Sequence, residues 1–342
     1  MKPVPVIAFF CNQGGVGKTS LVYHLAWMYA DLGARVLAAD LDPQANLTAA
    51  FLAEELLEDL WPEGEHPNTI SGCLKPLREG TGDVRKPHLE SIDERLAIIP
   101  GDPDLSDFED ALSEAWLPCL VDDERAVHIT SAFWQVIQEA AASHRSDLIL
   151  MDLGSNSGAI NRAALIASDS IVVPLSPDPF SLQGLRNLGP KLRAWRSNWQ
   201  TRLEKKVAAQ DRHLPLGRMH PIGYVLRHHS AYLSRSAHAY DRWMQQIPGG
   251  FRKTVLNVEV EAAPMSPRLD VNCLAILKDY RSLMSLAQQT RKPVFHMKPA
   301  DGALGSHLQA AQEARHDFTR LALRIASKAN FTWQGMPQEA TL

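Results

Sequence analysis

The feature that most constrains this chain is a glycine-rich loop between a buried strand and a helix. Residues 4–11 are an unbroken apolar run, which is typical of a strand buried on both faces, and GGVGKT follows at 14–19. Apolar residues then recur at helical spacing from about Lys18 to Leu32, and Gly33 predicts the end of that helix. Because glycines let backbone N–H groups converge on phosphates at a helix N-terminus, the segment predicts a phosphate-binding loop.

The side chains of this loop suit a nucleotide with Mg²⁺. Lys18 would place its charge on the β- and γ-phosphates, and the Thr19 hydroxyl would ligate the metal. The general pattern GxxxxGKT requires glycine at its first position, where this chain has Asn12. A glycine turn that merely precedes a helix is the alternative, which the strand–loop–helix context disfavours. The cofactor-binding residues expected here are Gln13, Gly14, Gly15, Val16, Gly17, Lys18, Thr19 and Ser20.

Carboxylates end two further apolar strands. Residues 35–40 complete a strand–helix–strand unit, which predicts a parallel sheet, and ligands of such sheets lie at the carboxyl ends of strands. An acidic residue there, Asp40 or Asp42, would position a water or polarise the ligands of Mg²⁺, although Asp40 alone would serve equally well as a helix cap. Asp152 ends the strand at 147–152, a pattern that holds Mg²⁺ through water beside a phosphate-binding loop.

The rest of the chain predicts more strands and helices of one α/β domain spanning residues 1–330. Further strands are expected at 96–100, 170–174, 221–226 and 293–296, and helices at 126–144, 161–167, 181–206 and after 296. A loop is expected after residue 100, and 228–285 is interpreted as mostly helical. The irregular segments near 53–95 and 197–275 are interpreted as insertions, and 331–342 as a frayed tail.

Composition narrows the class of protein. The four cysteines at 11, 73, 119 and 273 form no CxxC pair, which indicates reduced thiols and no zinc site. No apolar stretch approaches the roughly 18–20 residues of a membrane span, so we expect a cytoplasmic protein without a membrane partner. A net charge of −4 argues against wholesale coating of nucleic acid but not against a local basic patch.

One such patch is predicted on the helix at 181–206, where basic residues greatly outnumber the single acidic residue Glu204. A face of this kind would neutralise DNA phosphates without reading sequence, and a solvated basic face is an equally weighted alternative. The candidate DNA-binding residues are Arg186, Lys191, Arg193 and Arg196.

Residues 12–48 resemble the opening of the ParA/MinD family of ATPases, also called deviant Walker ATPases, whose motif is KGGVGKT followed by DxDPQxNxT. The resemblance continues through DLILMDLGSNSGAINRAAL, SIVVPLSPDPFSLQGL and KPVFHMKPAD, so it covers most of the chain. It implies that Lys18 is the catalytic loop lysine, and that Asp42 is the catalytic carboxylate that orients the attacking water. It also implies a metal site of Thr19, Asp42 and Asp152, and adds Pro177 to the nucleotide-binding residues.

The same resemblance implies a doubly wound, mostly parallel sheet flanked by helices, with ATP or ADP and Mg²⁺ as cofactors. It implies slow hydrolysis of ATP to ADP and phosphate in an ATP-dependent homodimer that positions a cargo on the nucleoid. The implied partners are an adaptor of ParB or McdB type and non-specific DNA. A non-hydrolysing or weakly hydrolysing ATP-binding regulatory module of the same fold is the alternative. An ATP-dependent metallochaperone would require a ligand pair such as CxxC, which the chain lacks.

One position departs from the family. The signature lysine, which in the family crosses the dimer interface to the partner's phosphates, falls at Gln13, and a neutral amide cannot supply its charge. Relatives resembling McdA, which position carboxysomes, also lack this lysine. Arg162 is our first candidate for a substitute cation, with Lys298 and Lys292 as further candidates, and an ordinary surface charge is the alternative for each.

Overall fold

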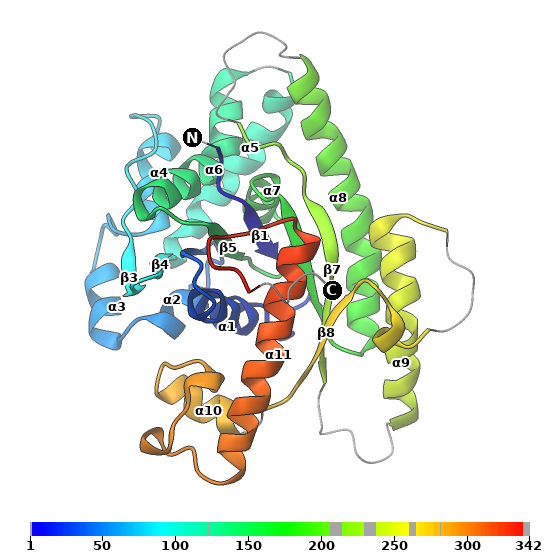
Figure 1. Ribbon diagram of the computed structural model, residues 1–342. Coiled ribbons are helices and arrows are strands. Elements are labelled where there is room, and N and C mark those ends of the chain that lie inside the picture. Colours follow the sequence, from blue (N-terminus) through cyan, green and yellow to red (C-terminus); the bar gives the residue numbers. More distant parts are fainter. Residues whose placement is uncertain are drawn as a thin grey trace.

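The computed structural model describes residues 2–121, 123–205, 214–228, 237–259, 265–280 and 282–337. Its centre is an eight-stranded sheet in the order β3-β4-β2-β5-β1-β6-β7-β8 (Figure 1). All neighbouring strands are parallel except β3, which is antiparallel to β4, so the predicted mostly parallel α/β sheet is confirmed. The strands are β1 Val6–Phe9, β2 Val36–Asp40, β3 Glu90–Asp93, β4 Leu96–Ile99, β5 Leu148–Asp152, β6 Ser170–Leu175, β7 His220–His228 and β8 Cys273–Lys278.

Helices cover both faces of the sheet, and each face has its own core (Figure 1). There are two cores because successive side chains of a strand point to opposite faces of the sheet. In β1, Val6 and Ala8 enter one core while Ile7 and Phe9 enter the other. The first core contains α4 Ile70–Glu79, α5 Phe108–Leu120, α6 Glu124–His144, α7 Ala159–Ile166, α8 Pro179–Lys205 and α9 Ala237–Gly250. The second contains α1 Lys18–Asp31, α2 Asn46–Phe51, α3 Glu54–Leu60, α10 Ser282–Gln289 and α11 Ser306–Lys328.

Three predicted elements were wrong. The loop expected after residue 100 contains α5, whose Phe108, Leu112 and Cys119 are buried on one helical face. The mostly helical stretch 228–285 contains the edge strand β8, which pairs in parallel with β7. The last strand expected at 293–296 is instead a short 3₁₀ helix, Val294–His296, so the last strand along the chain is β8. Of the expected insertion at 197–275, residues 206–213, 229–236 and 260–264 lie outside the described part of the chain.

The tail is packed as far as the structure describes it, so the expectation of fraying from residue 331 was wrong there. Phe331 and Trp333 are buried, stack on each other at 5.1 Å between ring centroids, and both meet Tyr29 edge-on. The Trp333 indole Nε1 also donates a hydrogen bond of 2.9 Å to the carbonyl of Leu32. These contacts anchor residues 331–337 on α1, and 338–342 lie outside the described residues. No helix among the described residues is long and apolar enough to cross a membrane.

Candidate functional site

The glycine-rich loop leaves β1 at Phe9 and enters α1 at Lys18, as predicted. Gly15 and Gly17 have φ angles of 75° and 86°, a left-handed conformation that side chains other than glycine's rarely tolerate. Gly17 caps α1 without any side-chain hydrogen bond, so the first N–H groups of the helix remain available to a ligand. The Lys18 Nζ atom lies 3.2 Å from the carbonyl oxygen of Gln13, which holds the ammonium over the loop. The loop therefore presents donors suited to an anion such as phosphate.

Two carboxylates end neighbouring strands beside this loop. Asp40 on β2 and Asp152 on β5 are register partners, and β5 lies between β2 and β1. Both are fully buried, yet they differ in their partners. Asp40 accepts hydrogen bonds of 2.8 Å from both the backbone and the hydroxyl of Thr48, and one of 3.3 Å from the backbone of Asp42. Asp40 thus fastens α2 to the sheet, which corresponds to the capping alternative.

Asp152 is the exception, because neither of its carboxylate oxygens has a hydrogen-bond partner among the described residues. Burial raises the pKa of Asp152 well above its usual range, and the charges of Asp40 and Asp42 raise it further. The nearby Thr19 hydroxyl and Lys18 ammonium lower the pKa of Asp152 and so offset part of this rise. The contact between Thr19 and Asp152 is nevertheless too poor in geometry to count as a hydrogen bond. A buried carboxylate without donors beside a hydroxyl and two more carboxylates is a donor set that fits Mg²⁺. The predicted ligands Thr19, Asp42 and Asp152 would hold it.

A cavity of about 670 Å³ opens beside the loop, Thr19 and Asp42, within the size range of small-molecule sites (~300–1,000 Å³). Its lining includes the predicted Gly14, Gly15, Gly17, Lys18, Thr19, Ser20 and Asp42. The Asp42 carboxylate is half-buried and accepts a hydrogen bond of 3.1 Å from the backbone N–H of Gln44, while a Cβ placed on Gly154 would lie 3.3 Å from its Oδ1 atom. Asp42 therefore sits between the loop that follows β2 and the loop that follows β5.

The cavity also has lining residues that the sequence reasoning missed. They come from α1, β7 and the segment around α10, and include Tyr23, His24, Arg227, Met284, Gln288 and Arg291. Arg227 is the last residue but one of β7, and its guanidinium lies 3.3 Å from where a Cβ on Gly17 would stand. Its place at the carboxyl end of a strand was the signal that could have found it. The α10 residues carried no such signal, because they reach the cavity only through the fold.

His24 connects the cavity to the segment that follows α10. Its Nδ1 donates to the carbonyl of Ser20 at 2.6 Å, and its Nε2 accepts from the backbone of Val294 at 3.3 Å. Complete burial lowers the pKa of His24 to about 4, so the ring is neutral in the folded protein. The ring stacks on Phe318 of α11 with 4.9 Å between centroids. His24 thus joins the first turn of α1 to the C-terminal part of the chain.

Four predicted nucleotide-binding residues are absent from the lining of this cavity: Gln13, Val16, Asp152 and Pro177. Gln13 and Pro177 do not line the large cavity but border a separate one of about 220 Å³, which Gly14, Gly15 and Val16 share with the turn after β6. The Gln13 amide donates to the Asp178 carboxylate at 3.1 Å and accepts from the Ser181 hydroxyl at 2.7 Å. This side chain therefore faces the start of α8.

The candidate substitute cations are also placed away from the loop or neutralised. Arg162, our first candidate, donates to the carbonyl of Leu112 at 3.0 Å and lies 4.4 Å from the ring centre of Trp116, so it packs on α5 and away from the loop of its own chain. Lys292 does line the cavity, but its Nζ pairs with the Asp301 carboxylate at 2.5 Å. Lys298 is exposed and is absent from the cavity lining.

The basic helix α8 is less basic on its surface than its sequence predicts. Arg193 donates to the carbonyl of Thr254 at 2.6 Å, and Arg196 donates to the carbonyl of Met219. Burial lowers the pKa of Arg196. Among the four predicted DNA-binding residues, Arg186 and Lys191 are exposed. The other two hold α8 against the segments before β7 and after α9.

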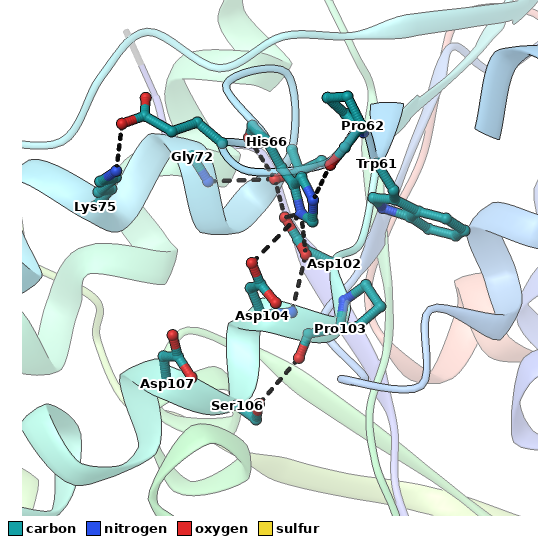
Figure 2. Close-up of polar contacts among 12 residues, drawn as sticks. Trp61, Pro62, His66, Gly72, Lys75, Asp102, Pro103, Asp104, Ser106 and Asp107 are labelled. Atoms are coloured by element: carbon teal, nitrogen blue, oxygen red, sulfur yellow. Dashed lines mark hydrogen bonds and ion pairs between the residues drawn. The ribbon is translucent and has the colours of Figure 1, made fainter. Parts of the chain in front are cut away.

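A second polar cluster lies near the carboxyl end of β4, where Figure 2 shows His66 beside the carboxylates of Asp102 and Asp104. The His66 Nδ1 lies 2.9 Å from Asp102 and 3.6 Å from Asp104, and its Nε2 lies 3.1 Å from the carbonyl of Pro62. Both ring nitrogens face acceptors, and although partial burial lowers the pKa of His66, the hydrogen bond and charge of Asp102 raise it above its ordinary value, which favours an imidazolium in an ion pair over a metal ligand. Asp102 also accepts from the hydroxyl of Thr69. The cluster fastens the segment between α3 and α4 to the sheet.

Comparisons with known proteins agree with this geometry. A family model described as an AAA domain, AAA_31, matches residues 4–205. The ParA family virulence plasmid protein pGP5-D of Chlamydia psittaci is 28% identical over 183 residues, which are 53% of this chain and 61% of that protein. The sporulation initiation inhibitor Soj of Bacillus subtilis is 28% identical over 183 residues, which are 54% of this chain and 62% of Soj. The match thus spans about 60% of the length of these two relatives.

Solved structures share the whole fold at lower identity. Protein DIP2308 from Corynebacterium diphtheriae superposes with a TM-score of 0.67 at 22% identity, over 95% of this chain and 98% of that one. A Cyanothece McdA in complex with ATP superposes with a TM-score of 0.58 at 14% identity, over 98% and 99% of the two chains. At these identities the likeness extends to the fold alone.

Proposed function

The chain belongs to the AAA_31 family of AAA domains, among the P-loop ATPases of ParA/MinD type, and on this premise we propose that it is a slow, Mg²⁺-dependent ATPase. The observation that carries the proposal is Asp152, a buried carboxylate without partners among the described residues, placed beside Thr19 of the phosphate-binding loop. Such a carboxylate is costly in the nucleotide-free protein. A role in holding Mg²⁺ with a nucleotide explains that cost.

Each residue of the site would have a separate role in hydrolysis. Lys18 would leave the carbonyl of Gln13 and bind the phosphates together with the free N–H groups that open α1. Bound Mg²⁺ would neutralise charge that develops on the phosphates. Asp42, which lines the cavity, would orient a water so that its oxygen bonds to the γ-phosphorus while the bond to ADP breaks, and the proton of the water would pass to an oxygen of the released phosphate. Arg227 adds a positive charge in the same cavity without a carboxylate partner among the described residues.

The finer proposal is an ATP-dependent homodimer that positions or partitions a cargo such as a plasmid, chromosome or protein organelle. A relative named for chromosome partitioning and a ParA family protein of a virulence plasmid support this role. We propose an adaptor of ParB or McdB type as the partner that senses the ATP-bound form. ATP would favour the dimer by binding it more tightly than the monomer.

A single comparison tests the activity. We expect purified protein to release phosphate from ATP slowly with Mg²⁺ and not with EDTA. Asp42→Ala should still bind ATP but turn over at least about tenfold more slowly, because a water-orienting group affects chemistry more than binding. That variant should also accumulate as a dimer with ATP in size-exclusion chromatography with light scattering. Asp59→Ala, an exposed carboxylate on α3, is the matched control. Unchanged turnover in Asp42→Ala would move the catalytic role elsewhere.

The alternative is an ATP-binding regulatory module that hydrolyses weakly or not at all. The neutral Gln13 favours this alternative, because it brings no positive charge to the phosphates. ATP binding by calorimetry together with no Mg²⁺-dependent phosphate release above the EDTA control would establish it.

Association with the nucleoid is a further proposal, and it now rests on Arg186 and Lys191, the two exposed residues of the predicted patch. We expect ATP-dependent DNA binding that weakens with salt, because phosphate contacts release counterions. Arg186→Glu with Lys191→Glu should abolish the DNA-bound band in an electrophoretic shift and leave ATP binding intact. DNA binding that needs no ATP, or that persists after both charge reversals, would rule out this surface.

A further inference from the structure

The amide of Gln13 is held at both of its ends. Its Nε2 donates to Asp178 Oδ2 at 3.1 Å, and its Oε1 accepts from the hydroxyl of Ser181 at 2.7 Å. The other Asp178 oxygen accepts from the backbone N–H of Ser181 at 2.7 Å, and the Ser181 hydroxyl accepts from the backbone of Ser176 at 3.0 Å. These bonds form a closed ring, hereafter the clasp, of Gln13, Asp178 and Ser181. Every donor in it faces an acceptor.

The clasp joins the phosphate-binding loop to the first turn of α8. Ser181 lies in that turn and Asp178 immediately precedes the helix. A carboxylate at this point is also favoured by the positive end of the helix dipole. On its backbone side, the Gln13 carbonyl accepts from Lys18 Nζ at 3.2 Å and from the Cys11 thiol at 3.3 Å. One residue therefore contacts both the phosphate-binding lysine and the start of α8.

We infer that Gln13 is a positioning residue that couples nucleotide occupancy of the loop to the first turn of α8. The inference rests on the proposed nucleotide binding, because Lys18 must leave the Gln13 carbonyl to reach a phosphate. That departure removes one of the bonds that hold Gln13, whose amide is bonded to α8. The first turn of α8 carries Phe180, which is 73% exposed. A shift of this turn would therefore alter a surface that a partner protein can bind.

The electrostatics of the clasp explain why an amide suits position 13. Asp178 offers two acceptor oxygens, so the residue opposite must donate to it while accepting from Ser181, and an amide does both. Gln13→Glu keeps the shape but sets two carboxylates against each other. Adding Asp178→Asn restores one acid and one amide and keeps every donor opposite an acceptor. Gln13→Lys would instead be captured by Asp178 of the same chain.

Calorimetry with ATP and Mg²⁺ on the full chain tests the positioning role. We expect Gln13→Glu to weaken ATP binding about tenfold, the equivalent of one charge-assisted hydrogen bond, and the double variant to return within about threefold of wild type. Gln138→Glu is the matched control, because Gln138 also bridges two groups, the backbone N–H and carbonyl of Val4, away from the loop. It should leave ATP affinity unchanged. Wild-type affinity in Gln13→Glu, or no rescue in the double variant, would overturn the role.

Hydrogen exchange tests the coupling separately. ATP with Mg²⁺ should change amide exchange over residues 179–185 in wild type, and Gln13→Ala should lose that change at ATP concentrations that saturate it. An equal ATP-dependent change in both proteins would refute the coupling. If wild type did not bind ATP at all, the proposed function would fail. The clasp would then still be tested without nucleotide, because Gln13→Ala should speed exchange over 179–185 and an unchanged rate would refute it.

Discussion

The isosteric change Asp152→Asn should stabilise the nucleotide-free protein while it removes Mg²⁺-dependent activity. Asp152 is fully buried, and neither oxygen has a partner among the described residues. Burial and the charge of Asp40 raise its pKa, so the ionised form is disfavoured in the fold. An amide does not ionise in either state, so it removes the stability that the raised pKa costs at neutral pH and any repulsion from Asp40. The same change removes the proposed ligand of Mg²⁺, so stability and function should move in opposite directions.

The size of the stability change follows from the burial. Both the carboxyl and the amide are buried polar groups, each costing about 1–3 kcal/mol when unpaired, and the carboxyl costs more because it can ionise. We take the difference between them to be of the same order, about 1–3 kcal/mol. The entropy of unfolding is about 2.1 cal/mol/K per residue, so for 342 residues 1 kcal/mol corresponds to roughly 1.4 °C in Tm. We therefore expect the Tm of Asp152→Asn without nucleotide to lie about 1–4 °C above that of wild type.

Differential scanning fluorimetry with and without ATP and Mg²⁺ measures both effects. Wild type should gain Tm on addition of Mg²⁺ with ATP, and the variant should lose the part of this gain that depends on Mg²⁺. Asp102→Asn is the matched control, since Asp102 is equally buried but accepts from His66, Thr69 and the backbone of Asp104. It should lower Tm. The reasoning is refuted if Asp152→Asn lowers Tm without nucleotide or keeps the full Mg²⁺-dependent gain.

Three further changes test other parts of the site. Lys18→Ala should weaken ATP binding at least about tenfold in calorimetry, because it deletes the phosphate-binding charge, whereas the exposed Lys298→Ala should not. Since burial lowers the pKa of His24 to about 4 from ~6.5 in the unfolded chain, the free energy of unfolding should fall by about 3 kcal/mol as pH drops between these values. His24→Asn should flatten that slope in urea titrations, and an unchanged slope would exclude His24 as its source. The hydrogen bond and charge of Asp102 outweigh partial burial and raise the pKa of His66, so its stabilising contribution is present below ~6.5 and is lost as pH rises through the raised value. The Tm deficit of His66→Ala should therefore be larger near about pH 6 than near about pH 9, and an equal deficit would contradict the ion pair.

Much of the fold and part of the site are determined locally, and the sequence by itself was enough to predict them. The features that predict the loop lie within about 30 residues of each other: the apolar strand β1, the glycines and Lys18. Their structure depends on local backbone conformation and burial. Asp152 was predictable for the same reason, because an apolar strand that ends in a carboxylate needs no distant partner to be recognised. The parallel order then brings the ends of β1, β2 and β5 together, since parallel strands end at one edge of the sheet.

The tertiary structure alone decided which charges are free. Arg162, Arg193 and Arg196 look like surface cations in the sequence, but each meets a backbone carbonyl at least 23 residues away. Gln13 similarly finds Asp178 across 165 residues, and His24 finds Val294 across 270. A charged side chain has the same chemistry on the surface and in contact with another segment. Whether it is solvated or bonded to another segment depends on packing between elements, and no local pattern encodes that packing.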